Sequence, residues 1–97
     1  MIDKSKFYIN GTWVNPILKN DFEVINPSNE ESYAIISLGS KKDVDIAVSA
    51  AKKAFITWSQ VDKKEKISLL EKLLKIYKSR WDEITQIMSD EMGAPLD

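Results

Sequence analysis

Phe7-Tyr-Ile-Asn-Gly-Thr-Trp-Val14 is the stretch of sequence that decides how the chain begins to fold. Its central Asn10-Gly11 dipeptide lies between two apolar runs and tolerates positive φ at both positions, which is the strongest short-range signal for a two-residue hairpin turn. A second apolar run, residues 22–25, follows after seven residues of loop. Pro27 has no backbone N–H and pushes Asn26 away from helical geometry, so we expect the strand to end there.

The middle of the chain predicts one more strand and a long helix. Residues 28–31 favour a turn in which Asn29 takes the left-handed conformation. The β-branched and aromatic run 33–38 predicts a strand. Ser40 is placed to cap a helix over residues 41–57, because its hydroxyl can accept from an amide of the first turn, that of Asp43. The apolar positions of this helix recur at helical spacing: Val44, Ala47, Val48, Ala51, Ala54, Phe55 and Trp58.

The last third of the chain predicts two further helices. Residues 62–65 resemble a capping box in which Asp replaces Ser or Thr, and they mark the start of the second helix. We expect a break at residues 79–80, because residues 81–83 are typical of an acidic first helical turn. Gly93 is the expected C-cap, and Pro95 prevents the helix from continuing. One apolar face runs along both helices: Ile67, Leu70, Leu74, Tyr77, Trp81, Ile84 and Met88.

Composition is that of a globular domain and excludes several function classes. The chain has 97 residues, 43% of them hydrophobic and 30% charged, which suits one small domain or part of a larger one. A net charge of −1 argues against a nucleic-acid binder, which needs a basic excess. No apolar run approaches the roughly 20 residues of a membrane span, and the first residues do not resemble a signal peptide. We therefore expect a cytoplasmic protein with no nucleic-acid and no membrane partner.

Two residue types that carry much enzyme chemistry do not occur in this sequence. It contains no cysteine and no histidine, and so no thiolate nucleophile and no imidazole base. Trp13, Trp58 and Trp81 fall on the stripes of the predicted strands and helices, so we interpret them as packing residues rather than a stacking platform. Asp90 and Glu91 are neighbours on a predicted helix and point in different directions. We interpret them as surface charges without a partner.

Taken in order, these segments resemble the amino-terminal segment of the NAD(P)-dependent aldehyde dehydrogenases, over about residues 7–96. The hairpin, the run ending in Asn-Pro, the capped alanine-bearing helix and the Leu/Ile helix ending in Glu-Met-Gly-Ala-Pro carry the resemblance. Asn29 stands where the family often has glycine, and Ala94 where lysine is usual. The resemblance implies an α/β family in which this chain alone is α+β. We expect short N-terminal strands with a hairpin, then two to three helices, in one fragment over residues 1–97 that flanks the dinucleotide-binding domain.

The resemblance also implies an activity, the oxidation of an aldehyde to a carboxylic acid with NAD or NADP. In the family a cysteine thiolate attacks the aldehyde to give a thiohemiacetal, hydride passes to the nicotinamide, and a glutamate-activated water hydrolyses the thioester. This sequence holds neither a cysteine nor the family's Glu-Leu-Gly-Gly and cofactor-loop motifs. We therefore expect a scaffold with no catalytic and no cofactor-binding residue, inactive by itself and unable to bind NAD.

One candidate site is carried over from the family. In many relatives, backbone carbonyls just before the Asn-Pro pair help to coordinate a structural Na⁺ or K⁺. Matched residue by residue, these carbonyls belong to Val24 and Ile25. Two carbonyls are too few oxygen ligands by themselves. The alternative is that both are ordinary strand residues with buried side chains.

The apolar helix face keeps a second function open. The run from Ile67 to Met88 is roughly heptad, which suits an independent helical protein-interaction module. Leaving such a face in water loses about 10–20 kcal/mol of the free energy that burial of its side chains would contribute. We therefore expect the chain to cover it by self-association or against the remainder of the enzyme.

Overall fold

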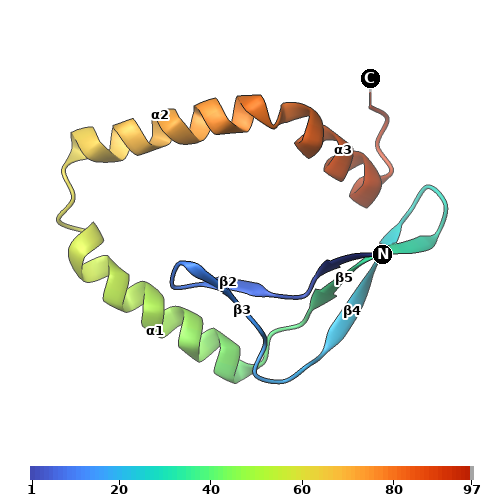
Figure 1. Ribbon diagram of the computed structural model, residues 1–97, viewed down its shortest axis with the longest axis horizontal. Coiled ribbons are helices and arrows are strands. Elements are labelled where there is room, and N and C mark those ends of the chain that lie inside the picture. Colours follow the sequence, from blue (N-terminus) through green and yellow to red (C-terminus); the bar gives the residue numbers. More distant parts are fainter. Residues whose placement is uncertain (97) are drawn as a thin grey trace.

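The computed structural model describes residues 1–96, in which strands come first and helices follow (Figure 1). Within these residues no helix is both long and apolar enough to cross a membrane. The described part of the chain is α+β, as the sequence predicts. Its elements are β1 (Ile2–Lys4), β2 (Phe7–Ile9), β3 (Thr12–Val14), β4 (Asp21–Asn26), β5 (Glu31–Ser37), α1 (Lys41–Trp58), α2 (Lys63–Ser79) and α3 (Trp81–Met92).

The predicted hairpin is confirmed and consists of β2 and β3. Tyr8 pairs with Trp13 across it, with ring centroids 5.2 Å apart. Asn10 and Gly11 form the turn with φ of 53° and 79°. Both angles lie in the left-handed region that a type I′ turn requires, which is why this dipeptide predicts the hairpin correctly. One face of the hairpin contacts α1 through β2.

β5 is the central strand of a three-stranded sheet with the order β1-β5-β4, in which β4 is antiparallel and β1 parallel to it. Ala34 on β5 is the only buried hydrophobic residue among residues 1–96. Ser37 Oγ donates to the carbonyl of Ser5 at 2.7 Å and holds the end of β1 against β5. β1 is not predicted from the sequence, because its three residues form no pattern and only pairing with a distant segment makes them a strand.

The turn between β4 and β5 corrects the prediction for Asn29. Glu30, and not Asn29, has the positive φ, at 59°. Asn29 uses its side chain instead, accepting from the N–H of Glu31 at 2.9 Å, and Asn26 accepts from the N–H of Ser28 in the same way. Because these amides close local turns with their side chains, the left-handed position falls one residue later.

The two predicted helix caps have different outcomes. Ser40 caps α1 as predicted, its Oγ accepting from the N–H of Asp43 at 3.3 Å, and the Asp43 carboxylate completes a capping box on the Ser40 N–H at 2.9 Å. α1 ends at Trp58, one residue beyond the predicted end. Asp62 opens α2 with extended backbone, but within the described residues its side chain makes no capping bond. The capping box predicted at residues 62–65 is therefore wrong.

The predicted break and C-cap in the last third are confirmed. Arg80 leaves helical geometry between α2 and α3, so the heptad-like run does not form one continuous helix. Gly93 ends α3 with φ of 70°, its N–H donating to the carbonyl of Ser89 at 2.8 Å. A Cβ on Gly93 would lie 3.1 Å from Pro27 Cγ and 3.3 Å from Ser28 Oγ. The end of α3 is therefore seated on the turn between β4 and β5.

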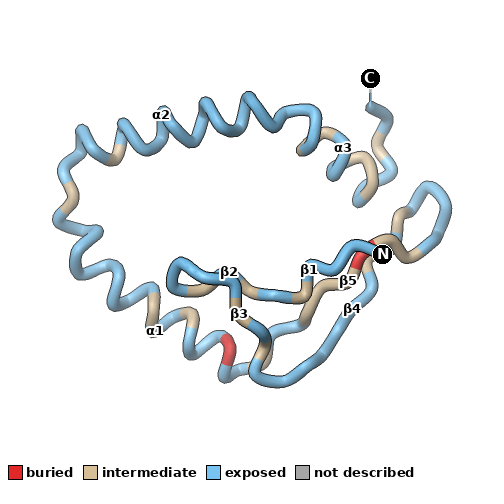
Figure 2. Tube along the Cα trace, viewed as in Figure 1, coloured by how far each residue is buried: buried red, intermediate tan, exposed pale blue. Residues whose placement is uncertain are grey.

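The chain has an open, flat shape. Its radius of gyration is 17.2 Å and its extents are 48 × 37 × 15 Å. α1 contacts β2 and α3 contacts β4, whereas α2 runs between the other two helices with no comparable contact in the described part of the chain (Figure 1). Among residues 1–96, the buried residues are Ala34 in the sheet and Asp43 at the start of α1 (Figure 2).

Candidate functional site

Val24 and Ile25, the candidate cation ligands, lie at an irregularity of β4. Val24 pairs with Ala34, but Ile25 pairs with Ser32, so the register shifts between them and Tyr33 has no partner on β4. A bulge of this kind disrupts the regular ladder and redirects the backbone groups around it. Ile25 is 55% exposed and Val24 half-buried, so the alternative of two buried side chains does not hold for Ile25.

β5 pairs with this part of β4 and α3 contacts β4, and both elements carry side-chain oxygens. The hydroxyl of Ser32 is buried and has no hydrogen-bond partner in the described residues, which is unusual for a buried polar atom. Tyr33 lies near the end of α3, where partial burial and the charges of Glu91 and Asp90 raise the pKa of its phenol. The bulge, the hydroxyl and the α3 carboxylates thus belong to one region of the molecule.

Asp90 corrects the interpretation of the acidic pair as surface charges without partners. It is half-buried, and its Oδ1 accepts a hydrogen bond from Gln86 Nε2 at 2.9 Å. The i, i+4 spacing of the two residues on one helix is the signal that the sequence analysis overlooked. Glu91 is exposed.

The donor set at the bulge fits part of a shell for a hard cation. Carbonyl, hydroxyl and carboxylate oxygens are the ligands that such cations take. Residues 1–96 contain no cluster of three His, Cys, Asp or Glu side chains arranged to hold a metal. The candidate ligands at the bulge are therefore the backbone oxygens of Val24 and Ile25.

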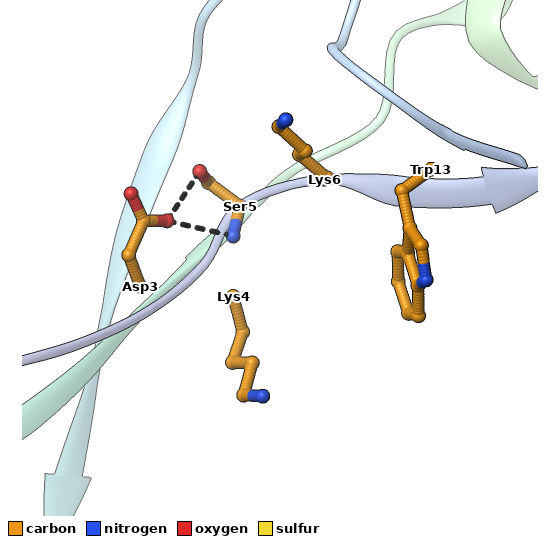
Figure 3. Close-up of a pocket in the computed structure, with 5 residues that line it drawn as sticks. All are labelled: Asp3, Lys4, Ser5, Lys6 and Trp13. Atoms are coloured by element: carbon orange, nitrogen blue, oxygen red, sulfur yellow. Dashed lines mark hydrogen bonds between the residues drawn. The ribbon is translucent and has the colours of Figure 1, made fainter.

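A shallow hollow of about 360 Å³ lies beside the hairpin, lined by Asp3, Lys4, Ser5, Lys6 and Trp13 (Figure 3). The Asp3 carboxylate accepts from the N–H of Ser5 at 3.0 Å and from its hydroxyl, and these bonds lower the pKa of Asp3. Lys4 and Lys6 extend in opposite directions. Because its charged groups do not converge, the hollow has no evident chemistry.

The tryptophans lie on separate elements, and each packs against one neighbour. Trp81 meets the ring of Tyr77 edge-on at 5.6 Å, and Lys66 Nζ lies 5.2 Å from the ring centroid of Trp58. Trp13 packs against Tyr8 across the hairpin. Each keeps nearly half or more of its surface exposed, so the packing is one-sided.

Asp43 accepts three hydrogen bonds at the start of α1 and holds the loop that contains Ile17. Its carboxylate accepts from the N–H of Ile17 at 3.0 Å, from the N–H of Ser40 at 2.9 Å and from the Ser40 hydroxyl at 2.8 Å. These bonds, that of Ile17 first, lower the pKa of Asp43. The sequence predicts Asp43 only as a residue of the first helical turn, because its bond to Ile17 joins positions that lie 26 residues apart in the chain. Its role is structural, holding that loop on the start of α1.

The model of the aldehyde dehydrogenase family matches residues 13–97. The chain belongs to the aldehyde dehydrogenase family. It is 45% identical over 96 residues to the 3-succinoylsemialdehyde-pyridine dehydrogenase of a Pseudomonas species. The match covers 99% of this chain and 20% of that protein. The resemblance inferred from the sequence is therefore confirmed.

Solved aldehyde dehydrogenase structures share the fold of this chain. The enzyme from Bartonella henselae is 49% identical and superimposes with a TM-score of 0.99, covering 100% of this chain and 20% of its own. Aldehyde dehydrogenase C from Pseudomonas syringae, solved with NAD⁺ and octanal, is 37% identical with a TM-score of 0.93, covering 95% of this chain and 19% of its own. This chain thus spans about a fifth of the length of the aldehyde dehydrogenases that it matches.

Proposed function

We propose that this chain is the amino-terminal scaffold of an oxidoreductase that oxidises an aldehyde to a carboxylic acid with NAD⁺ or NADP⁺. The observation that carries the proposal is its superposition, over its full length, on the aldehyde dehydrogenase of B. henselae. NAD⁺ is the cofactor in the P. syringae complex, which supports NAD for the family. Since this sequence contains no cysteine, the thiolate that forms the thiohemiacetal belongs to the remainder of the enzyme.

The part that this chain plays is structural. The hairpin, the sheet and the three helices present apolar side chains to solvent, and the hollow beside the hairpin does not gather a nucleophile, a base and an oxyanion donor. We propose that the chain flanks the dinucleotide-binding domain as a scaffold and that other residues of the enzyme carry the chemistry. We place the enzyme in the cytoplasm.

A chimera tests this function. The first fifth of the B. henselae enzyme is replaced by this chain, and NADH formation is measured with a panel of aldehydes, the intact enzyme serving as control. We expect the chimera to form NADH. The 97-residue chain alone should form none, and NAD should give no calorimetric signal with it. A soluble but inactive chimera, or NADH formation by the chain alone, contradicts the proposal.

We also propose that the carbonyls of Val24 and Ile25 contribute to a structural site for Na⁺ or K⁺. The register shift between them, the unpartnered hydroxyl of Ser32 and the nearby α3 carboxylates support it. When bound, the cation would take the carbonyl oxygens of the β4 bulge as ligands and attract the carboxylates at the end of α3.

A salt exchange tests the cation site. In the chimera, replacing choline by Na⁺ or K⁺ should slow amide exchange of peptides that cover β4 and the end of α3. Ser32→Ala should weaken this response, while Ser49→Ala, at an exposed serine of α1, should leave it unchanged. Equal exchange in choline and in both alkali cations would rule the site out.

A further inference from the structure

The chain exposes far more surface than a folded monomer of its size. Its accessible surface is 8393 Å², whereas a compact protein of 11.1 kDa exposes about 5,700 Å². Its radius of gyration of 17.2 Å exceeds the value of about 12.5 Å expected for this length. The chain therefore exposes about 2,700 Å² more than a compact monomer of its size.

α2 carries many of the exposed large apolar side chains. Apart from the half-buried Lys66, every residue of the helix is exposed. The apolar side chains cover one half of the helix circumference, and the charged ones occupy most of the other half. We call this half the α2 face; it comprises Ile67, Leu69, Leu70, Leu73, Leu74, Ile76 and Tyr77, each at least 40% exposed.

The similarity to complete aldehyde dehydrogenases indicates which protein covers this surface. The chain matches about a fifth of each relative, and it has the same backbone arrangement as that fifth of the B. henselae enzyme. An open, flat conformation shared with a complete enzyme is one that the rest of that enzyme supports. The occupant that we infer is aldehyde dehydrogenase protein that corresponds to the remaining four fifths of these relatives.

We propose that this surface binds the remainder of an aldehyde dehydrogenase tightly enough that residues 1–97 stay bound to it without a peptide bond. The inference rests on the proposed function and names the partner of the scaffold. An excess of about 2,700 Å² on one side corresponds to a total interface at or above about 5,000 Å², the range of permanent complexes. For an interface of that size, the peptide bond between the two parts contributes to their association only by raising their effective concentration.

The experiment cuts the polypeptide of a folded chimera directly after residue 97. The chimera described above receives a protease site directly after residue 97 and a tag on its larger part, and it is cleaved after purification. We expect the two pieces to remain together at a one-to-one ratio in gel filtration. Pieces that separate, or a small piece that leaves to sediment as a dimer of itself, overturn the inference. A chimera that is insoluble where the intact enzyme with the same protease site is soluble also overturns it.

Two matched variants locate the contact on the α2 face. Leu70→Asp and Ser68→Asp each add one carboxylate to exposed positions of the same helix, one within the α2 face and one outside it. Leu70→Asp should weaken retention of the cleaved piece at least about tenfold, and Ser68→Asp should leave it unchanged. An equal effect of both variants overturns the inference. Activity is scored separately: retention in an inactive chimera supports the docking surface and contradicts only the proposed function.

Discussion

α1 and α2 begin in similar sequence contexts, at an N-cap residue with an acidic residue three positions later, yet they are held in different ways. At the start of α1, Ser40 and Asp43 form a reciprocal capping box, and Asp43 also bonds the N–H of Ile17. At the start of α2, Asp62 makes no side-chain capping bond within the described residues. The comparison teaches that the first helix is tied to the rest of this chain, whereas the second depends on what covers it.

The end of α3, like the start of α1, contacts a distant segment of the chain. Gly93 is seated against Pro27 and Ser28, so this helix is anchored by close backbone approach. The anchored ends of α1 and α3 lie on either side of α2, and four predictions compare the anchored regions with the open one.

The largest effect is expected at Gly93. Gly93→Ala adds a Cβ at φ of 70° and within 3.1 Å of Pro27 Cγ, so it should lower the free energy of unfolding by about 2–4 kcal/mol. Gly11→Ala is the matched control, since its φ is 79° but no described atom lies within 4 Å of the added Cβ. It should cost only the backbone strain, about 1–2 kcal/mol. Urea unfolding followed by circular dichroism, at one fixed protein concentration, measures both.

Acid should release the anchor at Asp43. Its pKa is lowered in the folded chain, so its contribution to stability is fully present above the unfolded pKa of about 3.9. That contribution is lost as the pH falls through the lower folded pKa. Hydrogen exchange at the amides of Ile17 and Ser40, corrected for the intrinsic rate, should show a loss of protection at acid pH. Asp43→Asn should abolish this acid step, and Asp45→Asn, an exposed neighbour on α1, should leave it intact.

The two helix caps provide a smaller and sharper contrast. Ser40→Ala removes a capping bond and should cost about 1 kcal/mol of stability. Asp62→Ala should change the stability by less than experimental error, because its side chain makes no cap in the described structure. Helix content and urea midpoints of both variants measure the difference. A loss at Asp62 as large as that at Ser40 would mean that the two helix starts are held alike.

The smallest effect is expected at Glu83. Its carboxylate accepts from Arg80 Nε at 2.9 Å, and this bond lowers the pKa of Glu83. The pair is exposed and screened by solvent, so Glu83→Gln should leave the urea midpoint unchanged at physiological salt. A clear shift of the midpoint would show that the break between α2 and α3 is held by this pair.

Local chemistry settled much of this fold from sequence alone. The Asn10-Gly11 turn, the Ser40 cap, the break at Arg80 and the C-cap at Gly93 each depend on residues close together in the chain. The family resemblance came from the same segments taken in order. For the candidate cation site, sequence and resemblance supplied Val24 and Ile25 and nothing of their surroundings.

Contacts between distant segments were decided only by the tertiary structure. β1 becomes a strand because it pairs with β5, Asp43 becomes an anchor because Ile17 reaches it, and Ser32 meets Ile25 only through a shifted register. A residue's own identity carries little information about such partners, since pairing depends on where the chain returns. The sequence determined which helix faces are apolar, and the tertiary structure decided that they stay open, because this chain brings no second layer to cover them.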